Sequence, residues 1–254
     1  MLGLSNSRTI QTQTRQITQR LFCFPYAGGA ASIYRDWGNK LPSSIEVHPV
    51  QLSGHGNRLR EPLFKRVQPL AESTAQELMP YLEGPFAFFG HSMGAIISFE
   101  LAHLLRRENK PGPSHLFLSG RPCAHLTQKE APTYDLPEPE FIEELRRMEG
   151  TPNEVLEHPE LMAMLSPILR ADLEICQTYE CEPRPPLDCP ITVFGGLQDK
   201  DVSREQLEGW REYTTSSLTV RMFPGNHFYL HNSAPSLLRM IAQDLRYMPG
   251  GNGP

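Results

Sequence analysis

The sequence predicts an α/β fold, with a mostly parallel β-sheet flanked by helices and a helical lid inserted between two strands. Two observations indicate it. Short apolar runs alternate with longer segments of helical periodicity. The short runs are also apolar without interruption, as strands are when both faces of a parallel sheet are buried. The length of 254 residues suits one domain with an inserted subdomain and is short for two domains.

Six short apolar runs are the predicted strands. The first, LFCFP (21–25), ends at a proline and leads into the loop YAGGAAS. Each of the others is compact, apolar and followed by a turn that contains glycine or proline. They lie at 44–52, 86–90, 115–120, 191–196 and 218–223.

Helical periodicity fills most of the chain between these strands. PLAESTAQELMPYL (69–82) repeats leucine and alanine along one face, as an amphipathic helix does. AIISFELAHLLRREN (95–109) carries one apolar stripe and stops at the strong breaker NKPGPS. APSLLRMIAQDLRYM (234–248) closes the chain as a helix.

Residues 121–186 break this rhythm, because they contain no good strand. EPEFIEELRRM (138–148) has helical composition, and TPNE (151–154) can start a second helix with a capping box between its threonine and its glutamate. The serine and proline at 166–167 repeat the same start signal. An insertion at the carboxyl side of a sheet can cover a site there, so we interpret it as a lid. The alternative is a helical elaboration without a gating role.

Composition and charge argue against several partners. The net charge of −5, without a basic block, disfavours nucleic acid and anionic membranes, and no run approaches the ~20 apolar residues that span a bilayer. Five irregularly spaced cysteines predict neither a disulfide framework nor a zinc site, and they fit a reducing cytosol. We expect a cytoplasmic monomer without a metal. Its domain is predicted at 20–247, between a disordered tail at 1–19 and a flexible tail at 248–254.

The motif GHSMG (90–94) is the strongest chemical signal. A predicted strand runs directly into it and a predicted helix runs directly out, which is the setting of a nucleophile elbow. The sharp turn requires small residues at positions 90 and 94, two residues before and after Ser92. The Ser92 hydroxyl then stands at a helix N-terminus, where developing negative charge is favoured.

A serine needs a base, and the base needs a carboxylate, which on this fold follow in the order Ser, Asp or Glu, His. His227 lies in FPGNHFYL just after the last strand, where the base should be, and His231 is the less favoured candidate. In the loop after 191–196, both Asp199 and Asp201 qualify as the carboxylate. We favour Asp199, because it is nearer the end of the strand. Asp201 lies two residues before Ser203, which with Gln206 predicts the cap of the next helix, so Asp201 is expected to serve that helix start.

Acyl transfer also needs donors for a tetrahedral oxyanion. One is the backbone N–H of Met93, which follows the nucleophile. The other is predicted in PYAGGA (25–30), with Ala27 the favoured donor, because its glycines allow close backbone approach. The alternative for these glycines is a plain turn.

Four stretches together resemble the type II thioesterases, stand-alone α/β-hydrolases that accompany polyketide and non-ribosomal peptide synthetases. They are FCFPYAGGAAS, GHSMGA, VFGGLQDKDV and FPGNHFYL, with VQLSGHGNRLREP between the first two. The resemblance covers residues 20–247. It implies hydrolysis of acyl or aminoacyl thioesters on the phosphopantetheine arm of an acyl or peptidyl carrier protein. It also implies a triad of Ser92, Asp199 and His227, an oxyanion hole from Ala27 and Met93, and no cofactor.

Two departures from the family pattern leave the catalytic side chains in place. The family usually has Pro-Gly-Arg where this chain has Ser-Gly-His at 53–55, and Gly-Gly-His where it has Gly-Asn-His at 225–227. His55 is expected to alter the polar edge of the site. Asn226 is expected to keep the loop intact, because asparagine tolerates left-handed backbone angles.

Three other functions stay open at this point. A carboxylesterase or an acyltransferase of the same fold would use the same residues on small free esters or with another acceptor. A non-catalytic binding module would keep the fold alone. Carrier proteins are usually acidic, so a basic rim would favour the thioesterase, and its weak candidates are Arg58, Arg60, Arg146 and Arg147.

Overall fold

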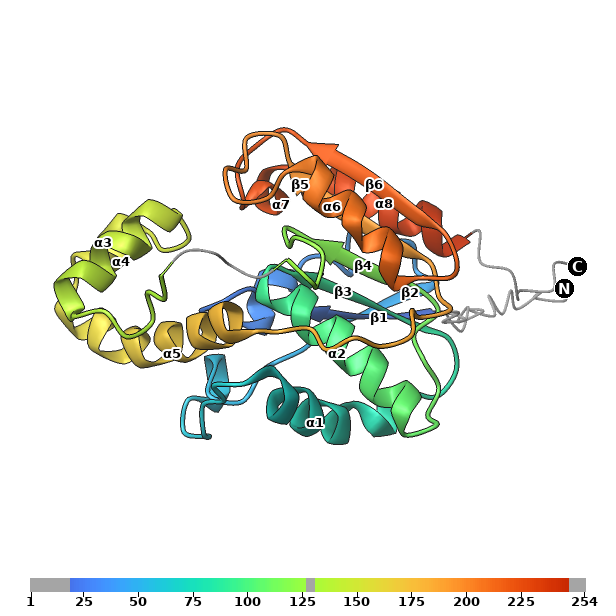
Figure 1. Ribbon diagram of the computed structural model, residues 1–254, viewed down its shortest axis with the longest axis horizontal. Coiled ribbons are helices and arrows are strands. Elements are labelled where there is room, and N and C mark those ends of the chain that lie inside the picture. Colours follow the sequence, from blue (N-terminus) through green and yellow to red (C-terminus); the bar gives the residue numbers. More distant parts are fainter. Residues whose placement is uncertain (1–18, 127–130, 247–254) are drawn as a thin grey trace, which may run out of the picture.

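The sheet predicted from the sequence forms the centre of the molecule. A computed structural model describes residues 19–126 and 131–246. Within them, six strands pair in the order β2-β1-β3-β4-β5-β6, and every pair is parallel (Figure 1). All six predicted strands are confirmed. Their bounds are β1 (Gln19–Phe24), β2 (Ile45–Pro49), β3 (Phe86–His91), β4 (Leu116–Ser119), β5 (Ile191–Gly196) and β6 (Leu218–Phe223).

The long predicted helices are also present. The helices are α1 (Val67–Leu78), α2 (Met93–Arg107), α3 (Glu138–Met148), α4 (Asn153–Leu156), α5 (Pro159–Thr178), α6 (Arg204–Glu208), α7 (Tyr229–Asn232) and α8 (Ala234–Arg246). Short 3₁₀ turns lie at Ala31–Tyr34, Gly56–Arg58, Met79–Tyr81 and Gly209–Tyr213. The turn at Met79–Tyr81 lies inside the helix predicted at 69–82. The other three have no counterpart in the sequence prediction, because three to five residues are too few to show a helical period.

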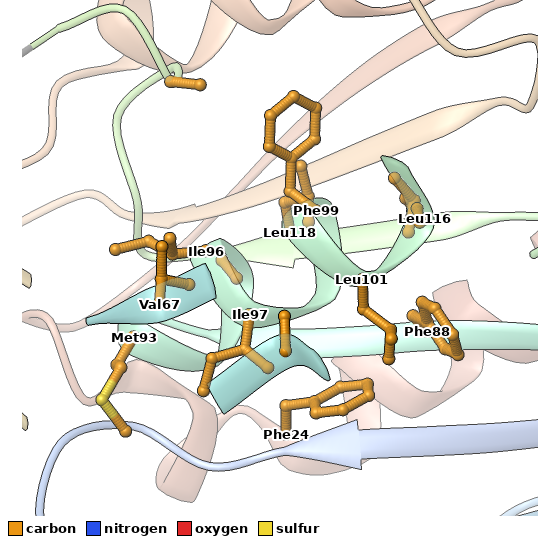
Figure 2. Close-up of a cluster of buried hydrophobic side chains, with 14 of the residues drawn as sticks. Phe24, Val67, Phe88, Met93, Ile96, Ile97, Phe99, Leu101, Leu116 and Leu118 are labelled. Carbon is orange, nitrogen blue, oxygen red and sulfur yellow. The ribbon is translucent and has the colours of Figure 1, made fainter. Parts of the chain in front are cut away.

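The two faces of the sheet are buried in separate cores, because alternate strand residues point to opposite sides. Phe22, Phe24 and Phe88 face a core shared with α1 and α2. Figure 2 shows Phe24 and Phe88 of the strands beside Ile97 and Leu101 of α2. The residues between them on the strands, such as Leu21, Cys23 and Phe89, pack instead against the 3₁₀ segment after β1 and against α8. Because both faces of the sheet are buried, the strand ends and the loops that follow them are held at one edge of the sheet.

The insertion has a small core of its own. Phe141 of α3, Leu156 of α4 and Met162 of α5 are buried together, apart from the two sheet cores. The guanidinium of Arg170 lies 3.9 Å from the centre of the Phe141 ring. In Figure 1, α3, α4 and the start of α5 stand beside the sheet and outside its layers. The prediction of a helical insertion is therefore confirmed.

Two predicted helix starts in the insertion are wrong. The capping box at 151–154 does not form, because Pro152 is extended (φ −57°, ψ 142°) and is itself the residue before α4. Pro152 has no side-chain acceptor, so α4 begins without a side-chain cap. Likewise, Ser166 and Pro167 do not start a helix. They lie inside α5, which begins at Pro159 and has His158 as its N-cap residue.

The reason for the second error is a tertiary contact. The Ser166 hydroxyl donates to Glu138 Oε2 of α3 at 3.0 Å, so it joins two lid helices and does not cap one. Pro167 removes one backbone donor from the helix interior, a loss that the packing of α5 tolerates.

The remaining predictions concern the chain ends and the membrane. The two tails lie outside the described residues, except that Gln19 is already the first residue of β1. In the described part of the chain, no helix is long and apolar enough to cross a membrane.

Candidate active site

Ser92 occupies a strained turn between β3 and α2. Its backbone angles are φ 55° and ψ −112°, a region that residues with a side chain rarely adopt. The Ser92 N–H donates to the Ser119 carbonyl of β4 at 2.8 Å, which anchors the turn to the neighbouring strand. The structure thus places Ser92 at the carboxyl end of the central strand, where α2 begins.

The two glycines of GHSMG are required by close backbone contacts. A Cβ at Gly90 would lie 2.0 Å from the Gly94 carbonyl oxygen, and one at Gly94 would lie 2.1 Å from the Phe24 carbonyl oxygen. Because backbone atoms line both spaces, no side-chain movement could make room. The expectation that only small residues fit here is confirmed.

His227 and Asp199 meet at this same edge of the sheet. His227 Nδ1 donates to Asp199 Oδ2 at 2.8 Å. The Asp199 side chain is fully buried, whereas that of His227 is 21% exposed. The backbone N–H groups of Asp201 and Val202 donate to the other oxygen of Asp199, at 3.0 and 3.2 Å. Asp199 is therefore held from two sides, and His227 lines the same cavity as Ser92.

The other candidate residues have different partners. Asp201 donates its backbone N–H to Asp199, two residues before the capping box that Ser203 and Gln206 form at the start of α6. His231 Nε2 lies 3.0 Å from the hydroxyl of Tyr26. Of the histidines in the insertion, His125 contacts Tyr213 and His158 caps α5.

The loop after β1 forms a tight turn beside Ser92. The Gly29 N–H donates to the Tyr26 carbonyl at 2.8 Å, and Gly28 has φ +75°, a combination typical of a type II turn. Met93 is the first residue of α2, so its N–H has no partner within the helix. Among the described residues, no backbone carbonyl accepts the Ala27 N–H either. Both groups are available to an incoming oxygen.

A cavity of about 760 Å³ opens over these groups. The sheet edge contributes Ala27, Ser92 and His227 to its wall. The insertion contributes mainly apolar side chains, which are Leu145, Met148, Leu169, Leu173 and Cys176. Polar side chains also line the cavity, among them Arg121 and, from the loop after β5 through α6 to the turn that follows it, Lys200, Glu205, Gln206 and Glu212. The cavity can therefore hold an apolar chain and a longer polar group that reach Ser92 together.

Sequence reasoning assigned no role to His91, the residue between Gly90 and Ser92. It is fully buried, and its Nδ1 lies 2.8 Å from the Ser119 hydroxyl, which in turn lies 2.5 Å from the Tyr229 hydroxyl. Its ring centre is 5.0 Å from that of His227. Burial, together with the neighbouring imidazoles of His227 and His231, lowers the pKa of His91 well below its ordinary value. The neutral imidazole of His91 thus packs against His227. Its position between Gly90 and Ser92 was the sequence feature that could have indicated this role.

The two departures from the family pattern act differently from the expectation. His55 is buried and is not part of the cavity wall; it lies 2.8 Å from Asp172 of α5. Asn226 does not adopt left-handed backbone angles. Its side chain instead accepts from the Phe228 N–H and donates to Glu149 at the end of α3.

The predicted basic rim is weak. Arg58 is bound by Glu61 and Glu77, and Arg146 pairs with Glu143. Of the four arginines, Arg147 lines the cavity. In the part of the chain that the structure describes, no group of three or more His, Cys, Asp or Glu side chains could hold a metal ion.

Comparison with known protein families matches residues 19–245 to the thioesterase domain. Two curated relatives are each 44% identical to this chain. Gramicidin S biosynthesis protein GrsT of Aneurinibacillus migulanus aligns over 89% of both chains. The protein named linear gramicidin dehydrogenase LgrE, of Brevibacillus parabrevis, aligns over 92% of this chain and 90% of its own.

Solved structures give the same result. The RedJ thioesterase from the prodiginine biosynthetic pathway of Streptomyces coelicolor is 42% identical, with a TM-score of 0.83. The match covers 89% of this chain and 85% of RedJ. The family match spans nearly all of the described residues, and the parallel sheet with its elbow agrees with it. The chain therefore belongs to the thioesterase family, has the α/β-hydrolase fold, and is a hydrolase of thioester bonds.

Proposed function

We propose that this enzyme uses Ser92, His227 and Asp199 to hydrolyse acyl or aminoacyl thioesters carried on the phosphopantetheine arm of a carrier protein. The observation that carries the proposal is the 2.8 Å bond from His227 Nδ1 to the buried Asp199, at the cavity into which the strained Ser92 opens. Neither a cofactor nor a metal takes part. The relatives named for gramicidin S and prodiginine biosynthesis support a role in removing acyl groups during such a pathway.

The hydrogen bond between His227 and Asp199 supports the following proton transfers. Because Nδ1 of His227 donates to Asp199, its Nε2 carries the lone pair and accepts the proton of the Ser92 hydroxyl. The Ser92 oxygen attacks the thioester carbonyl carbon, and the resulting oxyanion is stabilised by the N–H groups of Ala27 and Met93. The N-terminus of α2 favours the same negative charge.

The C–S bond then breaks, and His227 returns its proton to the leaving sulfur. A thiol has a pKa of about 8.5, so it leaves more readily than an alkoxide. In the second half, His227 takes a proton from water, and the hydroxide attacks the acyl ester of Ser92. The C–O bond breaks, the proton passes to the Ser92 oxygen, and the free acid is released.

The two parts of the cavity support a carrier-bound substrate. The apolar wall from α3 and α5 suits an acyl chain, and the polar part suits the amide-rich arm. A small free ester would fill little of a cavity of about 760 Å³. A carboxylesterase or an acyltransferase would use the same three residues, so the substrate distinguishes these functions.

The test compares a carrier protein loaded with acetyl or propionyl groups against matched p-nitrophenyl esters. Intact mass spectrometry follows loss of the acyl group from the carrier, with the wild-type enzyme and with Ser92→Ala. We expect fast unloading of the carrier, slower turnover of the free esters, and no unloading by Ser92→Ala.

Two results would contradict the proposal. Carriers that stay loaded while free esters turn over would assign the site to an esterase. Unloading at the wild-type rate by folded Ser92→Ala would remove Ser92 from the mechanism. Adding an alcohol or amine acceptor to the same assay tests for acyl transfer, which would appear as an ester or amide product in place of the free acid.

A further inference from the structure

A buried carboxylate of the lid helix α5 holds the turn that carries Ala27. Asp172 Oδ2 accepts the Gly28 N–H at 2.7 Å and lies 2.8 Å from His55 Nε2. The side chains of Asp172 and His55 are only 3% and 5% exposed. Three segments that are far apart in the sequence thus meet at one carboxylate oxygen, in hydrogen bonds that the charge strengthens.

His55 meets Asp172 as a cation. Its Nδ1 lies 2.9 Å from the Ser53 carbonyl, which can only accept, and its Nε2 faces a carboxylate. Both ring nitrogens therefore donate. Burial opposes this charge, but the hydrogen bond and charge of Asp172, with the Ser53 carbonyl, outweigh it and raise the pKa of His55 above its ordinary value. The charge of Asp172 is thereby compensated inside the protein, and its oxygen remains an acceptor for Gly28.

The Gly28 N–H belongs to the central peptide of the turn from Tyr26 to Gly29. This peptide can turn over between the type I and type II arrangements, which exchange the directions of its C=O and N–H. In the type I arrangement the Ala27 carbonyl oxygen would face the Asp172 carboxylate, and the two oxygens would repel each other. Asp172 therefore selects the observed arrangement, in which Gly28 has φ +75°.

A second contact joins the same turn to the same helix. Leu169 lies three residues before Asp172, on the same face of α5. A Cβ at Gly28 would lie 2.5 Å from Leu169 Cδ2, so the turn and the helix pack without room for a side chain. The helix α5 therefore holds this turn through a hydrogen bond and a packing contact.

We infer that Asp172 is a positioning residue for the oxyanion hole. It holds the Ala27–Gly28 peptide, and through it the turn whose preceding peptide carries the Ala27 N–H, so the seating of the lid helix α5 sets the geometry of this donor. His55 supports Asp172 by compensating its charge. The inference rests on the proposed function of Ala27. It also gives the insertion a role beyond covering the cavity, because one of its helices sets the geometry at the reacting carbonyl.

The experiment uses Asp172→Ala, Asp172→Asn and the control Glu174→Gln in the full chain. Glu174 is also on α5, but it ties the helix to Lys65 and Arg66, away from Gly28. Three kinds of quantity are measured: the steady-state parameters kcat and KM on an acyl carrier, the affinity for n-butylboronic acid, and the hydrogen exchange of the Gly28 amide. The boron accepts the Ser92 oxygen and becomes a tetrahedral anion that resembles the transition state.

For Asp172→Ala we expect kcat to fall about 10- to 100-fold with little change in KM, because a donor is misplaced and the substrate pocket is kept. The boronate affinity should fall by a similar factor, and the Gly28 amide should exchange faster. Asp172→Asn retains one acceptor oxygen without the charge, so its losses should be intermediate. Glu174→Gln should match the wild type in all three kinds of quantity.

A folded Asp172→Ala with wild-type kcat and boronate affinity would overturn the inference, as would a loss of kcat with unchanged boronate affinity. If Asp172→Ala does not fold, Asp172→Asn decides between the same outcomes. Failure of the proposed function is seen separately, as carrier unloading that persists in Ser92→Ala. The Gly28 exchange rate reports the contact with Asp172 in either case.

Discussion

The sheet scaffold and the helical insertion are held together in different ways. The scaffold buries both faces of a parallel sheet, and fully buried phenylalanines such as Phe22, Phe89 and Phe117 fill its two cores. In the part of the insertion that the structure describes, six buried residues form a separate core around Phe141. The scaffold also carries all three proposed catalytic side chains, whereas the insertion contributes cavity wall and the Asp172 contact.

This difference decided how well each region could be read from the sequence. In the scaffold, local pattern and tertiary environment agree, because a strand buried on both faces must be apolar along its length. In the insertion, helix ends depend on contacts with other helices, such as that of Ser166 with Glu138. The local start signals for α4 and α5 were therefore misleading. Because the scaffold and the insertion are held together differently, we expect them to respond differently to mutation.

The largest expected effect tests whether the chemistry lies on the scaffold. Asp199→Asn should lower kcat about 10⁴-fold, because an amide does not fix the His227 tautomer or stabilise its cation. Steady-state kinetics on an acyl carrier measures it. Asp201→Asn is the matched comparison and should lose less than about 10-fold. Equal losses in the two variants would contradict the assignment of Asp199.

The next effect tests whether the insertion is stabilised separately. Phe117→Ala in β4 should lower the free energy of unfolding by about 3–5 kcal/mol, because it leaves a cavity in the sheet core. Phe141→Ala removes the same side chain from the insertion, where we expect faster amide exchange across α3–α5 and a smaller loss of global stability. Urea denaturation and hydrogen exchange measure the two quantities. Equal global losses, with exchange unchanged in α3–α5, would show that both regions unfold as one unit.

The smallest effect concerns the His55–Asp172 pair, which joins the two regions. The folded-state pKa of His55 is raised, so its stabilisation is fully present below its ordinary value of 6.5 and is lost as pH rises through the folded pKa. The stability advantage of the wild type over His55→Gln should therefore shrink between pH 6 and pH 9. Urea denaturation at several pH values measures this advantage, and an advantage that grew with pH would contradict the cationic state of His55.

Much of the candidate site was predictable because its signals are local. The elbow is a five-residue motif between a strand and a helix, and Ser92, Asp199 and His227 each follow a predicted strand. Parallel strands end at a common edge, so these residues had to come together. His55 and Asp172 were different, because no local pattern relates residues 117 positions apart.

The sequence alone determined the strands, the parallel sheet, the elbow and the order of the candidate triad, because each depends on hydrophobic periodicity or on a short motif. Only the tertiary structure decided where α4 and α5 begin, that Asn226 binds Glu149, and that Asp172 holds Gly28. The physical reason is the range of the interactions. A strand is specified by its own apolar residues, whereas a buried hydrogen bond between distant segments exists only after packing has brought donor and acceptor within 3 Å.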